Sequence, residues 1–150
     1  MIRTATHSDI PAMIAIGQQV IDKSQTYNDK IDPAKAAYMI RRAINDKKME
    51  AFIAEKAGQV VGFFIALKDE NWFAKSYYGT DLAFCVLPEH ADQGVWLLRR
   101  FIRWCNSNGI KNITLGLSTG LDPDGRTGKL YESHGLKRVG GVYSTVKEVV

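Results

Sequence analysis

Apolar residues in the first third of the chain recur every three or four positions, which is typical of amphipathic helices. This spacing predicts one helix over residues 9–22 and a second from 33 to about 47. Thr6 and Asp9 have the spacing of a capping box at the start of the first helix. Asp32 stands where an N-cap residue would open the second helix, immediately before a proline. The chain therefore carries a helical pair near its N-terminus.

Shorter apolar runs, rich in β-branched and aromatic residues, predict strands. Ala57-Gly58 separates two of these runs and is a hairpin turn signal. The stretch 68–79 mixes polar and aromatic residues, so we expect a loop or a frayed hairpin there. The predicted strands of this region are residues 2–6, 50–56, 59–67 and 80–87.

The last third of the chain returns to alternating helices and strands. A broad apolar stripe predicts a buried helix over 94–107, and Gly109 is placed to end it. A strand is predicted at 110–117, a short helix at 126–134 and a terminal strand at 136–148. A helix between two strands implies a parallel pair with a right-handed crossover. The fold class is therefore α/β, with a mixed sheet of six to seven strands and helices on both faces.

Length and composition limit the class of protein. With 150 residues, of which 45% are hydrophobic and 24% charged, the chain matches one globular domain spanning 1–150. No apolar run approaches the roughly 18 residues of a membrane span, and the start does not resemble a signal peptide. Cys85 and Cys105 exclude a disulfide scaffold, suit a reducing cytoplasm and are expected to be buried.

Charged and metal-binding residue types suggest little specific chemistry by themselves. The net charge is +4, and the basic clusters are interpreted as solvated helix faces. Nucleic-acid binding is disfavoured because aromatic residues do not interleave with the basic ones. His90 and His134 have no partner at metal-ligand spacing, so no metal site is expected.

Three stretches, taken in order, resemble the acetyltransferase (GNAT) family, whose members transfer an acetyl group from acetyl-CoA to an amine. The resemblance covers essentially the whole chain and implies the GNAT acyltransferase fold. Its specificity comes from the order and spacing of the stretches rather than from any one of them. They read MIRTATHSDIPAMIAI, then TDLAFCVLPEH with GVWLLRRFIRWCNSNGIKNITL, then RTGKLYESHGLKRVG.

The loop before the long helix departs from the family pattern. The segment Pro88–Val95 is about two residues shorter than the family's phosphate loop, and only Gly94 matches a family glycine. Asp92 also brings a negative charge near the expected pyrophosphate position. Such contracted loops resemble those of small acetyltransferase-like proteins carried by phages.

The resemblance implies a coenzyme site at the N-terminus of the long helix, where backbone N–H groups can bind phosphate. Ser118, at the end of a strand, would hold the pantetheine arm, and Arg99 would reach the phosphates. The alternatives are a turn glycine at Gly94, a solvated Arg99 and a turn former at Ser118. The expected coenzyme-binding residues are Phe84, Cys85, Val86, Gln93, Gly94, Val95, Trp96, Arg99, Ser118 and Thr127.

Two residues are candidates for catalysis. Tyr131 matches the family tyrosine that approaches the coenzyme sulfur, where a phenol can protonate a thiolate. Asp81 stands where the family often carries a carboxylate that orders a water as base. The alternatives are a packed aromatic at 131 and a strand-end residue bonded to nearby backbone at 81. A backbone amide of the fourth strand would stabilise the oxyanion.

The first hypothesis is an acetyl-CoA-dependent N-acetyltransferase acting by direct attack on an amine of unknown identity. The alternative is an inactive GNAT-fold protein that binds or inhibits a partner, because fold does not imply function. Four aromatic residues are expected either to wall the acceptor pocket or to cover a sheet edge or homodimer contact. They are Trp72, Phe73, Tyr77 and Tyr78.

Overall fold

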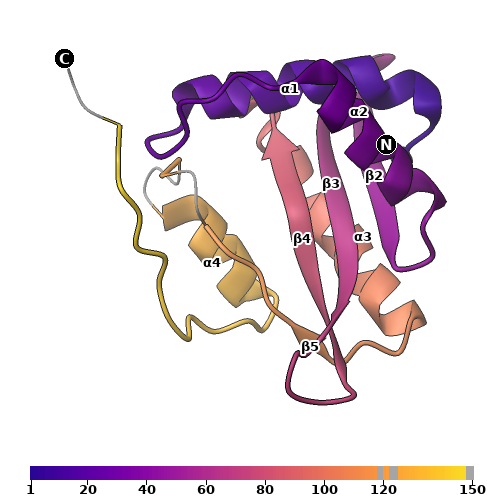
Figure 1. Ribbon diagram of the computed structural model, residues 1–150, viewed down its shortest axis with the longest axis vertical. Helices are drawn as coiled ribbons and strands as arrows, with labels where there is room; N and C mark the ends of the chain where they lie inside the picture. The colour runs from indigo at the N-terminus through magenta and orange to yellow at the C-terminus, as the bar shows by residue number, and fades with distance from the viewer. Residues whose placement is uncertain (118–119, 122–124, 148–150) are drawn as a thin grey trace.

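The computed structural model describes residues 1–117, 120–121 and 125–147 (Figure 1). Its strands form a five-stranded sheet in the order β1-β2-β3-β4-β5. These are β1 (Ile2–Thr4), β2 (Met49–Lys56), β3 (Gln59–Glu70), β4 (Tyr77–Val86) and β5 (Asn112–Ile113). The helices are α1 (Ile10–Lys23), α2 (Pro33–Asn45), α3 (Gln93–Ser107) and α4 (Arg126–Ser133), with short 3-10 turns at His7–Asp9 and Pro88–His90.

The strand pairing confirms the predicted mixed sheet. β1, β2, β3 and β4 pair antiparallel, whereas β4 and β5 are parallel and joined through α3. The parallel contact is short, because only Tyr78 with Asn112 and Gly79 with Ile113 are in register. The polar stretch 68–79 is largely hairpin, since β3 runs to Glu70 and β4 begins at Tyr77.

Two predictions about the C-terminal third are wrong. The strand predicted at 110–117 is paired only over Asn112–Ile113, and residues 136–147 form no strand. The part of the chain that the structure describes therefore forms a sheet of five strands rather than six or seven. A strand needs a neighbouring edge for its hydrogen bonds, and the short β5 offers too little of one. Instead, this segment passes along the side of α4 away from the sheet, and the N–H of Lys147 donates to the carbonyl of Gln25 (2.7 Å; Figure 1).

Helices cover both faces of the sheet, as the sequence predicts, and each face has its own core. On one face, α3 and α4 pack on Phe52 and Phe64, and the ring of Phe64 stacks on Phe101 with centroids 4.6 Å apart. On the other, α1 and α2 pack on Ile53 and Phe63. The sheet is therefore a fixed layer from which β4, beyond its short pairing with β5, can present groups to either side.

Gly79 lies where α3 packs most closely on β4. A methyl group on its Cα would stand 2.6 Å from Sγ of Cys105 and 3.3 Å from Cγ2 of Ile110. Overpacking of this kind costs about 1–3 kcal/mol, so we expect Gly79→Ala to lower the free energy of unfolding in urea by that amount. The control is Gly116→Ala, because no atom lies within 4 Å of the added methyl there. Equal losses in the two variants would contradict the packing argument.

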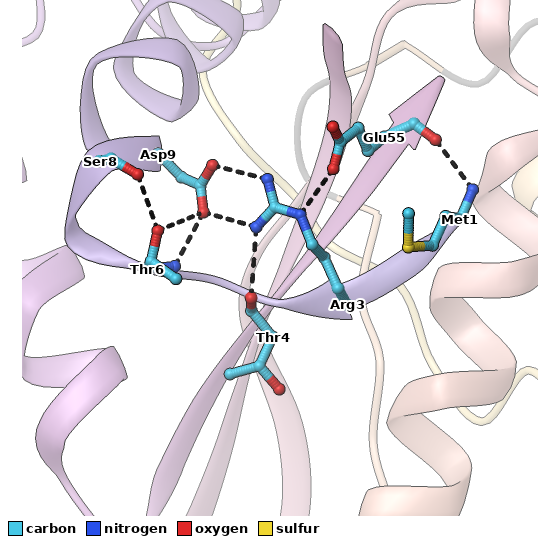
Figure 2. Close-up of polar contacts among 7 residues, drawn as sticks. All are labelled: Met1, Arg3, Thr4, Thr6, Ser8, Asp9 and Glu55. Atoms are coloured by element: carbon cyan, nitrogen blue, oxygen red, sulfur yellow. Dashed lines mark hydrogen bonds and ion pairs between the residues drawn. The ribbon is translucent and has the colours of Figure 1, made fainter. Parts of the chain in front are cut away.

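Arg3 links the first strand to the start of α1 (Figure 2). Its Nη1 and Nη2 donate to the carboxylate of Asp9 at 2.8 and 2.9 Å, and its Nε donates to Oε2 of Glu55 at 2.7 Å. The backbone N–H of Thr6 also donates to Asp9 at 2.8 Å, which is one of the hydrogen bonds of the predicted capping box. β1, β2 and the entry to α1 are therefore tied together at one point.

Because of this network, the stability of the fold depends on pH. The hydrogen bonds from Arg3 lower the pKa of Asp9 to about 2 in the folded protein, from an ordinary 3.8. A depressed carboxyl pKa stabilises the fold above the unfolded value, and the benefit is lost as the pH falls from about 4 towards 2. We expect Asp9→Asn to lower the free energy of unfolding by about 1–2 kcal/mol at pH 7. The variant should also lose less stability than wild type as the pH falls from about 4 to 2. Urea unfolding from pH 2 to 7 measures both, and parallel pH curves for the two proteins would argue against the network.

Candidate functional site

A cleft of about 950 Å³ runs along the edge of β4 beyond the point where β5 leaves it. Its lining comes from α1 and α2 on one side and from the N-terminal end of α3 and from α4 on the other. Figure 1 shows β4 between these two groups of helices. Because the paired part of β5 ends at Ile113, the carboxyl end of β4 is left to form the middle of the cleft.

A β-bulge interrupts β4 in the middle of this cleft. Ile65 pairs with Ala83 and Ala66 pairs with Asp81, so Leu82 is an extra residue with no partner on β3. A bulge leaves the extra residue's backbone groups out of the ladder and re-aims its neighbours. Leu82 lines the cleft and is 46% exposed. Sequence reasoning expected an amide of this strand but missed the bulge, because no glycine marks it.

Asp81, the residue before the bulge, also lines the cleft and is half-buried. Burial raises the pKa of its carboxyl above the ordinary value. Cys85 lies further along the same strand, and burial, with a smaller effect of the Asp81 charge, raises the pKa of its thiol to about 12. The thiol therefore stays protonated at neutral pH, which disfavours a nucleophilic cysteine.

The N-terminus of α3 forms one end of the cleft, with Gly94 and Val95 in its lining. The expectation that Gly94 offers its amide needs correction, because its N–H already donates to the carbonyl of Ala91 (3.1 Å). The amides of Gln93 and Val95 have no backbone acceptor among the described residues. Of these two residues, Val95 lines the cleft and Gln93 does not, so the amide of Val95 is the better candidate for an anion at this helix end.

Asp92 stands at the N-cap position of α3, on the rim of the cleft. The side-chain amide of Gln93 donates to its Oδ2 at 2.8 Å, and Nζ of Lys56 lies 3.9 Å from the same oxygen. The hydrogen bond from Gln93, with smaller help from Lys56, lowers the pKa of Asp92. Asp92 thus stays ionised, and Lys56 offsets part of the charge that it brings to the phosphate end.

Gln93, Trp96 and Arg99 lie outside the lining of the cleft. The guanidinium of Arg99 stands 5.1 Å from the ring of Trp96, and its Nε donates to Nε2 of His134 at 3.3 Å. Arg99 therefore links α3 to the end of α4. Of the other expected coenzyme-binding residues, Phe84, Cys85, Val86 and Thr127 line the cleft, whereas Ser118 is outside the described residues.

α4 forms the remaining side of the cleft. Tyr131 is 8% exposed, belongs to the core beneath α3 and also lines the cleft. Arg126, in the first turn of α4, lines the cleft as well, and sequence reasoning missed it. A single arginine beside a glycine carries no recognisable pattern, so only the packing of α4 beside α3 could reveal it. The cleft thus joins a carboxyl from β4 with a tyrosine and an arginine from α4.

Within residues 1–117, 120–121 and 125–147, no three or more metal-ligating side chains gather in one place. Over the same ranges, no helix is both long enough and apolar enough to cross a membrane.

A family model described as Acetyltransferase (GNAT) family matches residues 18–136. No curated protein matches the sequence. Among solved structures, the ribosomal-protein-alanine N-acetyltransferase from Brucella melitensis is 20% identical with a TM-score of 0.80, covering 93% of this chain and 86% of its own.

An aminoglycoside antibiotic 6'-N-acetyltransferase from Acinetobacter haemolyticus is 15% identical with a TM-score of 0.72, covering 100% of this chain and 99% of its own. A predicted acetyltransferase with acetyl-CoA, from Clostridium acetobutylicum, is 17% identical with a TM-score of 0.73, covering 97% and 94% respectively. The similarities to solved structures establish the fold. The family model matches most of the chain and therefore establishes the family.

Proposed function

Because the chain belongs to the acetyltransferase (GNAT) family, we propose that it transfers the acetyl group of acetyl-CoA to a primary amine by direct attack. The observation that carries this proposal is the cleft itself. Asp81, the bulge at Leu82 and Tyr131 all line this cleft. No acyl-enzyme is needed, since the thiol of Cys85 in the cleft is held protonated.

The proposed reaction balances with these groups. The neutral amine nitrogen attacks the thioester carbonyl, a C–N bond forms, and the nitrogen's proton passes to Asp81 directly or through water. A backbone N–H at the Leu82 bulge donates to the oxyanion. The C–S bond then breaks, and the thiolate takes a proton from the hydroxyl of Tyr131. Proton exchange with water moves the proton held by Asp81 back to Tyr131 and restores both groups. The products are an N-acetyl amine and free coenzyme A.

Acetyl-CoA would lie with its phosphates at the N-terminus of α3 and its pantetheine arm along Phe84, Val86 and Thr127. The amide of Val95 and the helix dipole support binding of a pyrophosphate there. The short loop and Asp92 weaken phosphate binding at this end, and Arg126 of α4 supplies a cation to the lining of the cleft.

We expect Arg126→Ala to raise the dissociation constant for coenzyme A about tenfold, because charge-assisted bonds to phosphate contribute about 1.5 kcal/mol or more. Isothermal titration calorimetry measures the change. The control is Lys129→Ala, an exposed residue of the same helix outside the cleft lining. S-acetylpantetheine, which lacks the pyrophosphate, should bind equally to wild type and Arg126→Ala. Unchanged coenzyme A affinity would remove Arg126 from the site.

Amine-dependent release of the coenzyme thiol, with mass spectrometry of the acetylated product, tests the function. The comparison proteins act, by their names, on an aminoglycoside and on a ribosomal-protein alanine, so both acceptor types belong in the panel beside small apolar amines. Coenzyme binding without transfer to any of these amines would favour the alternative of an inactive binding protein.

A cytoplasmic location is part of the proposal. Cys85 and Cys105 are both free thiols, which is compatible with a reducing compartment. A phage origin and a homodimer remain predictions from the sequence.

A further inference from the structure

The half of the cleft formed by α1 and α2 is largely apolar, although Gln19 and Lys23 of α1 also line it. Its floor is buried and consists of Met13, Ile40, Phe63 and Ile65. Its walls are apolar side chains that are only half-buried, among them Ile14, Val20, Ile31 and Met39. Apolar walls left partly open inside a concave site are typical of pockets that bind an apolar group.

The walls of this half are held in place. Gly17 brings α1 so close to the 31–32 segment that a methyl group on its Cα would stand 3.4 Å from Cδ1 of Ile31. The N–H of Ile31 donates to Oε1 of Gln18 at 2.8 Å, and Asp32 caps α2 by accepting from the N–H of Lys35 at 3.1 Å. The pocket is therefore formed before any acceptor binds, which lowers the entropy cost of binding.

Charge along the cleft is distributed unevenly. The described lining contains two carboxylates, Asp81 at the bulge and Asp92 at the α3 end beside Lys56. The charged side chain that α1 and α2 contribute is Lys23, a cation. An acceptor with several ammonium groups would have to leave one or more of them in an apolar pocket without a carboxylate, which is costly.

We propose that the acceptor is a monoamine whose primary amino group is carried by an apolar body, such as an aryl-alkyl or branched-alkyl group. This inference rests on the proposed acetyl transfer. The amino group reaches the bulge beside Asp81, and the apolar body fills the space between α1 and α2. The lining that the described residues form disfavours a polyamine or an aminoglycoside.

The experiment compares 2-phenylethylamine with spermidine as acceptors for the wild-type chain. We expect kcat/KM for 2-phenylethylamine to exceed that for spermidine about 10- to 100-fold, the range that burial of one apolar group supplies. Titration of both amines into the complex with coenzyme A gives the same comparison without turnover. A kcat/KM for spermidine equal to or above that for 2-phenylethylamine overturns the inference.

A pair of α1 variants locates the effect. Val20→Asp places a carboxylate in the apolar wall, and we expect it to lower kcat/KM for 2-phenylethylamine at least tenfold while that for spermidine is retained or rises. Ala15→Asp adds the same group on the exposed side of α1, outside the lining, and leaves both values unchanged. Met39→Gln, which keeps the side-chain length, should show the same preference change more weakly and covers a failure of Val20→Asp to fold.

The failures of the two proposals are distinguishable. Transfer to spermidine rather than to apolar amines contradicts the acceptor class and keeps the acetyltransferase. Failure to acetylate any amine, despite correct folding, contradicts the acetyltransferase and the acceptor class together. Equal effects of Val20→Asp and Ala15→Asp on both amines would place the acceptor outside the α1–α2 half and overturn the inference.

Discussion

Replacing Asp81 with asparagine is expected to lower kcat/KM for acetyl transfer by about 10²–10⁴-fold, the usual contribution of a general base. The carboxylate is the form that accepts the amine's proton, so wild-type activity falls as the pH drops through the pKa of Asp81. Burial raises that pKa above 3.8, so the fall in kcat/KM on the acid side of the pH profile occurs at a higher pH. A pH profile of kcat/KM for both proteins measures the effect, and the variant should lose this limb.

Asp69→Asn is the matched control, because Asp69 is an exposed carboxylate on the neighbouring strand that accepts from the hydroxyl of Tyr78 at 3.2 Å. It should leave turnover unchanged. Asp81→Asn should also fold at least as stably at pH 7 as wild type, since a raised pKa means that the buried charge costs stability. Full activity with an unaltered pH profile would remove Asp81 from the reaction.

The second large effect is expected for Tyr131→Phe. Loss of the hydroxyl removes the proton donor for the coenzyme thiolate, so kcat should fall about 10²-fold. KM for acetyl-CoA and the free energy of unfolding should change little, because the ring keeps its packing in the core. Steady-state kinetics and urea unfolding separate these quantities. Tyr38→Phe, on the exposed side of α2, is the control, and equal turnover of the two variants would show that the hydroxyl of Tyr131 takes no part.

Periodicity predicted the helices and the hairpin because each element buries one face, and burial leaves a regular pattern. The terminal strand at 136–148 was wrong for a different reason. β propensity describes how well a residue suits a half-buried sheet, and the short β5 provides no long edge for such pairing. The residue pattern alone carries no information about whether that edge exists.

The sequence likewise predicts only part of the candidate site. Asp81 and Tyr131 were found through family spacing, and the structure places both on the cleft. The bulge at Leu82 depends on the register between β3 and β4, which no local pattern specifies. Trp96 and Arg99 share a helix face, but that face meets His134 rather than the cleft. Which face of a helix borders a site is decided by packing against elements distant in the sequence.

The central claim is that this cleft binds acetyl-CoA despite its shortened loop. The most direct test is the melting temperature with acetyl-CoA, with free coenzyme A as a second ligand and ATP as the control. At about 100 times the dissociation constant, a ligand of the folded state adds about 2.7 kcal/mol, which corresponds to roughly 5–10 °C for a chain of this size. We expect that shift with both coenzyme forms and little with ATP. No shift at millimolar acetyl-CoA would contradict the claim and leave the cleft to another ligand.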